Sequence, residues 1–171
     1  MRQIKAVKSH QDRVPTAFTA DISLESHNKA ANYTEAKMKL SNVATLVDAT
    51  LLLALTFGGI LNWLHAFSST AASGTILSGL VFFGLLGLFI SLVQLPIDLY
   101  KTFILEEKFG FNKMSFSLFF KALMIGLIVS AVIGSIFIAG LLWVMETAGV
   151  NWWWYAWLLA ITFWFFIQYI S

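Results

Sequence analysis

The chain has 171 residues, of which 58% are hydrophobic and only 12% are charged. A soluble domain of this size carries about a quarter charged residues, so this composition indicates an integral membrane protein. The formal net charge is +2, and the charges do not form one basic face, so nucleic acid is not an expected partner. Cysteine is absent, which excludes disulfides, thiolate zinc sites and cysteine nucleophiles.

Residues 1–42 are predicted to form a cytoplasmic segment and helix. The basic start is not followed by an apolar run, so a secretory signal peptide is not expected. No Gly or Pro occurs over residues 22–57. We therefore predict one long helix from Ser23 or Leu24 onward, which starts in water and continues into the bilayer. Two pairs in it have the favourable i, i+4 order, Glu25 with Lys29 and Glu35 with Lys39.

Residues 43–171 are predicted to form a membrane domain, because a helix needs roughly 20 apolar residues to cross the hydrocarbon core. We expect the first helix to run through Gly58-Gly59 and the second to end at Pro96. The polar residues 96–122 are expected to form a cytoplasmic loop. The predicted fold class is therefore all-α, a polytopic membrane protein with four transmembrane helices preceded by a long cytoplasmic helix. The predicted spans are about 43–64, 74–95, 123–145 and 152–170.

The orientation follows from the distribution of positive charge. All eleven Lys and Arg lie in residues 1–39 or 101–121, and the links 66–73 and 146–151 contain none. The positive-inside rule then predicts that the N-terminus, the loop 96–122 and the C-terminus are cytoplasmic. We expect a multi-pass protein of the bacterial inner membrane. An aromatic belt is expected at the opposite face, from Trp143, Trp152, Trp153 and Trp154.

No pattern of catalytic or metal-binding residues is present. The three histidines, His10, His27 and His65, have no i, i+4 spacing and no H-E-x-x-H motif, so solvated or interfacial side chains are favoured over a metal site. Asp48 is the one acid well inside an apolar run. It is either the proton or ion site of a small transporter, or an acid near the interface that is solvated or paired. The second interpretation is favoured, because no other acid or base in a span could form a relay.

The third span carries small residues at four-residue intervals, Gly126, Ser130 and Gly134. This spacing places them on one face of a helix, where a second helix can approach closely. We predict that this face packs against another helix, either of this chain or of a partner. The alternative is a face that is simply exposed to lipid.

Two sets of residues carry a resemblance to a known family. In the polar island at residues 95–115 they are Leu95-Pro96, Tyr100, Phe103, residues 106–113 and Ser115; upstream they are Arg2-Gln3, Val14-Pro15, Lys29-Ala30, Tyr33 and Lys37. The island resembles a signature of the type 1 CAAX prenyl proteases, which are integral-membrane zinc metallopeptidases, and their bacterial relatives. Met114 departs from the Gln expected there. With the upstream matches, the resemblance covers nearly the whole chain.

The resemblance implies that the chain corresponds to spans two to five of a longer enzyme. The H-E-x-x-H motif and the other zinc ligand would follow Ser171, so no catalytic residue is transferred to this sequence. We expect no cofactor in this chain, zinc in the full-length enzyme, and no activity of this chain alone. Expected partners are the lipid bilayer, the missing catalytic domain and, in the complete enzyme, a peptide or prenylated-peptide substrate. The alternative function is a stand-alone membrane scaffold or partner subunit without catalysis.

The island itself is predicted to dock against the missing catalytic domain on the cytoplasmic side. Phe109 and Phe111 would fill apolar hollows, and Gly110 would allow the turn between them. The alternative is a solvated loop whose aromatic side chains dip into the membrane interface. The predicted polar contacts come from Glu106, Glu107, Lys108 and Asn112.

Overall fold

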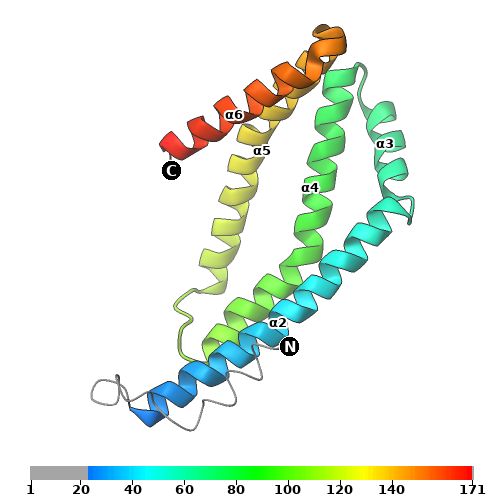
Figure 1. Ribbon diagram of the computed structural model, residues 1–171. Helices are drawn as coiled ribbons and strands as arrows, with labels where there is room; N and C mark the ends of the chain where they lie inside the picture. The colour runs from blue at the N-terminus through cyan, green and yellow to red at the C-terminus, as the bar shows by residue number, and fades with distance from the viewer. Residues whose placement is uncertain (1–22, 171) are drawn as a thin grey trace. The chain divides into compact units, whose positions relative to one another are not determined.

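The computed structural model describes residues 23–170, and Figure 1 shows its helices. The described chain is helical and contains no strand, which confirms the all-α fold class. The matches at Arg2-Gln3 and Val14-Pro15, and His10, lie outside the described residues. The elements are α2 (Leu24–Thr56), α3 (Ile60–Ala71), α4 (Thr75–Tyr100), the π-helix η2 (Lys101–Glu106), α5 (Phe116–Thr147), the 3₁₀ turn η3 (Gly149–Asn151) and α6 (Trp152–Ile170).

Four of these helical stretches are long and apolar enough to cross a membrane. Almost none of their side chains are buried inside the described structure. In water such helices would expose large continuous apolar surfaces, which soluble monomers avoid. A bilayer accepts these surfaces, so the described chain is a multi-pass membrane domain. The four stretches are Leu24–Thr56, Thr75–Glu106, Phe116–Thr147 and Gly149–Tyr169.

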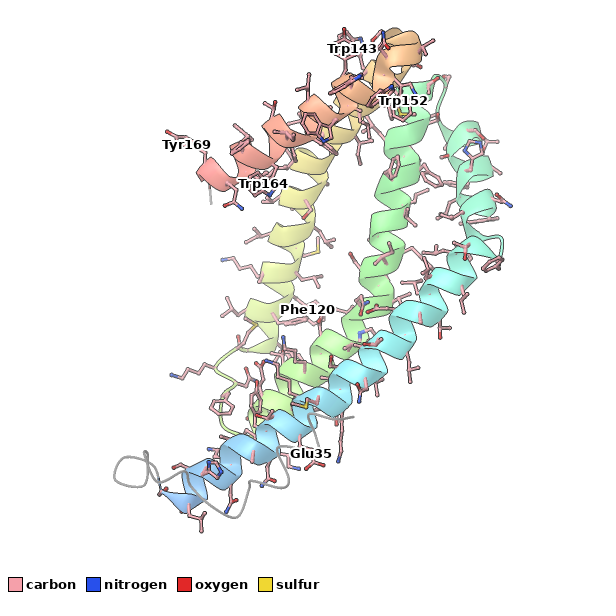
Figure 2. All side chains as sticks on the ribbon, in the orientation of Figure 1. Glu35, Phe120, Trp143, Trp152, Trp164 and Tyr169 are labelled. Atoms are coloured by element: carbon pink, nitrogen blue, oxygen red, sulfur yellow. The ribbon has the colours of Figure 1, made fainter. Side chains whose placement is uncertain are left out.

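The described residues divide into two compact units. The first combines most of α2 with the end of α4, η2 and the segment up to Met114. The second contains α3, the first part of α4, α5 and α6. In the second unit α5 packs on α6, where the rings of Phe137 and Phe163 lie 4.6 Å apart. Figure 2 shows Trp152, Trp164 and Tyr169 projecting along α6, whose bounds are those expected for the fourth span.

The expectation of one helix over residues 43–64 is wrong, because the chain leaves the helix after Thr56 and re-enters it at Ile60. Gly59 has a φ of +75°, a left-handed conformation that Gly adopts without steric cost. The helix then continues to Ala71. Most of the expected link at 66–73 is therefore helical.

The expectation that the second span ends at Pro96 is also wrong. α4 continues through Pro96 to Tyr100, and η2 extends the helical stretch to Glu106. In lipid a proline inside a helix is tolerated, because local π adjustments and neighbouring groups can satisfy the freed backbone carbonyl. α5 begins at Phe116, so the loop expected at 96–122 is reduced to a short turn around residues 109–115.

Candidate functional site

The helical stretch ends in a turn built by Gly110, which has a φ of +74°. The Gly110 N–H donates to the carbonyl of Glu107 at 2.9 Å, and the Phe111 N–H donates to the carbonyl of Glu106 at 2.8 Å. This pair of bonds is a Schellman motif, which satisfies the last carbonyls of a helix. Glycine is therefore required at this position for its backbone conformation.

Gly110→Ala is expected to lower the free energy of unfolding by about 1 kcal/mol, because a Cβ disfavours the left-handed conformation. An added Cβ would have room, since its nearest neighbour is the Lys29 Nζ at 3.8 Å. The effect is measured by denaturant-induced unfolding in detergent. Gly84→Ala is the control, because Gly84 has no positive φ and open space around it. Equal stability of the two variants would contradict this role of Gly110.

Asn112 and Ser115 organise the rest of the turn. The Asn112 Nδ2 donates to the Glu107 Oε2 at 2.9 Å, and its Oδ1 accepts from the Met114 N–H at 2.7 Å. Asn side chains commonly stabilise turns through such bonds to a backbone N–H two residues on. The Ser115 Oγ then accepts from the Leu118 N–H at 3.3 Å and caps α5. The island sequence thus encodes a helix end followed by a helix start.

The rings of the turn pack against α2. The Tyr33 ring meets the Phe109 ring edge-on at 5.4 Å and the Phe111 ring at 4.9 Å. The Lys29 Nζ lies 5.6 Å from the Phe111 centroid, and the Lys108 Nζ lies 5.9 Å from the Phe109 centroid. Aromatic pairs of this geometry contribute about 0.5–1.5 kcal/mol each beyond their buried area. We call these five residues the ring cluster.

The ring cluster joins the two matched strings of the sequence. Lys29 and Tyr33 belong to the upstream string, and the other three residues belong to the island. No local pattern in the sequence predicts the contact between the two strings. Phe109 is 9% exposed whereas Phe111 is 53% exposed. Phe109 therefore fills a site within this chain, and Phe111 retains a surface for other contacts.

Asp48 is paired within the first unit. Its Oδ1 accepts a hydrogen bond from the Gln94 Nε2, which agrees with the interpretation of a paired acid. Among the described residues, no three His, Asp or Glu side chains lie close enough to hold a metal ion. His65 lies beside an apolar ring, 6.4 Å from that of Phe82. No relay that a transporter would need is visible among these residues.

The small-residue face of α5 lies open in the described structure. A Cβ added at Gly126 or Gly134 would meet nothing within 4 Å, and Ser130 and Gly134 line an open hollow opposite Gly84 and Gly87 of α4. The close contacts of the second unit occur elsewhere, for example between Gly140 and Leu159. No described helix makes close contact with this face, so packing against a further helix stays a prediction, with exposure to lipid as its alternative.

The fold and these sites together define a multi-pass membrane domain, in which aromatic rings pack at the end of a helical stretch and residues 23–170 hold no group of three potential metal ligands. Residues 3–171 match the profile of a family described as CAAX prenyl protease N-terminal, five membrane helices. The chain therefore belongs to this family.

Several relatives are similar in sequence to most of this chain. It is 28% identical to a probable CAAX prenyl protease 1 from Schizosaccharomyces pombe, over 94% of the chain and 37% of the relative. It is 34% identical to a CAAX prenyl protease 1 homologue from Mus musculus, over 87% of the chain and 33% of the relative. The crystal structure of S. mikatae Ste24p matches 98% of this chain and 39% of its own, at a TM-score of 0.83 and 27% identity. The chain thus spans about two fifths of the length of such relatives.

Proposed function

We propose that residues 1–171 are the N-terminal, non-catalytic membrane region of a zinc metalloendopeptidase that hydrolyses peptide bonds in prenylated peptides. The observation that carries this proposal is the ring cluster. In it Lys29 and Tyr33, from the upstream matches, pack against Phe109 and Phe111 of the island, and membership of the family also supports the proposal.

The zinc ion and its ligands are expected in the remainder of the complete enzyme. The sequence has no H-E-x-x-H motif, and the described residues offer no group of three donors for zinc. We therefore assign no step of the hydrolysis to this chain. Its proposed role is to hold the membrane helices against the catalytic part.

The proposal is tested on the full natural chain that contains residues 1–171, purified in detergent. We expect one bound zinc per molecule and cleavage of a farnesylated peptide that stops when a chelator removes the metal. Reading the coding sequence beyond Ser171 is the quicker first step, because an H-E-x-x-H motif is expected there. Absence of zinc and of cleavage in the full natural chain would instead favour a membrane scaffold without catalysis.

We further propose that the island docks against the catalytic part. Phe111 and Lys108 are exposed, so they are the side chains best placed to make contacts outside this chain. Phe111→Ala is expected to lower the activity of the full enzyme several-fold while zinc remains bound. Lys37→Ala is the control, because Lys37 is also exposed but lies on α2, outside the island. Unchanged activity of Phe111→Ala would contradict docking.

The proposed orientation places the N-terminus, the island and the C-terminus in the cytoplasm. Because the chain contains no cysteine, single-cysteine variants give clean accessibility data. Lys113→Cys is expected to react with a membrane-impermeant maleimide only from the cytoplasmic side, and Ala148→Cys only from the opposite side. Labelling of both from one side would contradict this orientation. The bacterial inner membrane stays a prediction, since the relatives named above are eukaryotic.

A further inference from the structure

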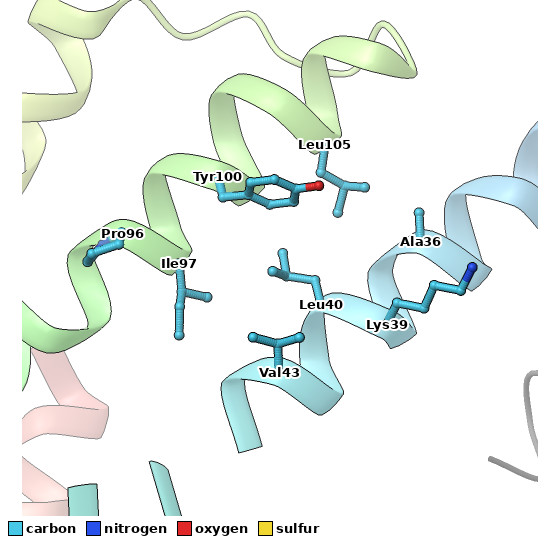
Figure 3. Close-up of a pocket in the computed structure, with 8 residues that line it drawn as sticks. All are labelled: Ala36, Lys39, Leu40, Val43, Pro96, Ile97, Tyr100 and Leu105. Atoms are coloured by element: carbon cyan, nitrogen blue, oxygen red, sulfur yellow. The ribbon is translucent and has the colours of Figure 1, made fainter. Parts of the chain in front are cut away.

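An apolar hollow of about 430 Å³ lies within the first unit, between α2 and the last part of the α4–η2 stretch. Figure 3 shows its lining side chains. On the α4–η2 stretch the lining begins at Pro96 in the last turns of α4 and ends at Leu105 in the π-helical turn of η2. Such turns often occur at functional sites. It is lined by Ala36, Lys39, Leu40, Val43, Pro96, Ile97, Tyr100 and Leu105.

The hollow lies where the apolar parts of two candidate spans meet their polar flanks. On α2 the lining runs from Ala36 to Val43, where the charged residues Lys37 and Lys39 give way to the uncharged run from Leu40 to Val47. On the α4–η2 stretch the order is reversed, since apolar residues precede Pro96 and the charged Asp98 and Lys101 follow. Both helices therefore place this hollow at the level where lipid headgroups meet hydrocarbon.

The lining of the hollow is almost wholly apolar, and its polar groups come from Lys39 and Tyr100. Figure 3 shows the Tyr100 hydroxyl directed between Leu105 and Leu40, and the Lys39 amine on the far side of Ala36. The Lys39 Nζ lies 2.9 Å from the Glu35 Oε1, and the Lys39 side chain is 67% exposed. An ammonium has three donors, so this ion pair leaves donors for an incoming anion. The hollow thus fits a molecule with an apolar chain and an anionic head.

We propose that this hollow binds one anionic phospholipid of the bilayer. One acyl chain would lie along Leu40, Val43 and Ile97, and its phosphate would accept hydrogen bonds from Lys39 and Tyr100. An unfilled apolar hollow loses dispersion contacts on its lining, and acyl chains are the apolar groups present at this level of the membrane. The bound lipid would brace α2 against the helix that carries the turn. This inference does not depend on the peptidase proposal.

The test uses the full natural chain in nanodiscs made of equal amounts of phosphatidylcholine and phosphatidylglycerol, followed by native mass spectrometry. We expect one retained phosphatidylglycerol. Ala36→Phe fills the hollow and should abolish this retention, whereas Ala49→Phe, the same change on α2 outside the hollow, should preserve it. Lys39→Gln should reduce the retained fraction about fivefold, as expected for one basic residue near a lipid surface. Lys37→Gln is the matched control and should leave it unchanged.

Equal retention by Ala36→Phe and Ala49→Phe would overturn the proposal and assign the retained lipid to non-specific contacts. Equal effects of Lys39→Gln and Lys37→Gln would overturn the assignment of the phosphate. Capture of a farnesylated peptide that displaces phosphatidylglycerol, and that is lost in Ala36→Phe, would assign the hollow to a substrate instead. Thermal unfolding of each variant separates these outcomes from misfolding, and it also measures the stability that Lys39→Gln loses with its ion pair to Glu35.

Discussion

Replacing Phe109 with alanine is expected to lower the free energy of unfolding by about 3 kcal/mol, the cost of emptying a well-packed aromatic site. Phe109 is buried at the end of the helical stretch and meets the Tyr33 ring at 5.4 Å. Its removal would leave a cavity between the turn and α2. The change is measured as a shift in the midpoint of denaturant-induced unfolding in detergent.

Phe111→Ala is the matched control for this prediction. It removes the same side chain two residues away, from a site that is more than half exposed, so a loss of about 1 kcal/mol is expected. A double-mutant cycle between Tyr33→Ala and Phe109→Ala should give a coupling energy of about 1 kcal/mol. A coupling near zero would show that the two rings do not pack together in the folded protein.

The composition and the length of the apolar runs were sufficient to predict the fold class. Exposed apolar helices need lipid, and the four candidate spans follow from hydropathy alone. The helix ends were harder to predict, because they depend on single residues. Gly59, with a left-handed φ, lies in the break between α2 and α3 and precedes the start of α3, whereas Pro96, a stronger breaker in water, lies inside a helix. The sequence shows both breakers but not which of them the tertiary structure accommodates.

The island illustrates a second limit of sequence reasoning. Its turn could be predicted from the sequence, since Gly and Asn indicate a turn after a helix. The contact between Phe109 and Tyr33 could not be predicted, because Tyr33 is far away in the chain and no local pattern links the two residues. The aromatic pair therefore looked like an external docking surface, whereas one of its rings packs inside this chain. Only Phe111 and the exposed charged side chains remain for that proposed docking role.

The small-residue face of α5 leads to the second large predicted effect. Gly134 lies on an open hollow, and an added Cβ would meet nothing within 4 Å. If a further helix of the complete enzyme packs there, Gly134→Leu should lower the stability of the full natural chain by up to about 3 kcal/mol, as overpacking does. Gly126→Leu should act in the same direction, because it lies on the same helical face.

Val132→Phe is the control for this second effect. Val132 is 55% exposed and lies on the side of α5 away from Gly134, since two residues correspond to about 200° of rotation. This substitution should change the free energy of unfolding by less than about 0.5 kcal/mol. If Gly134→Leu also leaves the free energy of unfolding of the full chain unchanged, the face is exposed to lipid. A loss for Gly134→Leu alone indicates a helix seated on this face, because lipid adapts to an added side chain and a packed helix does not.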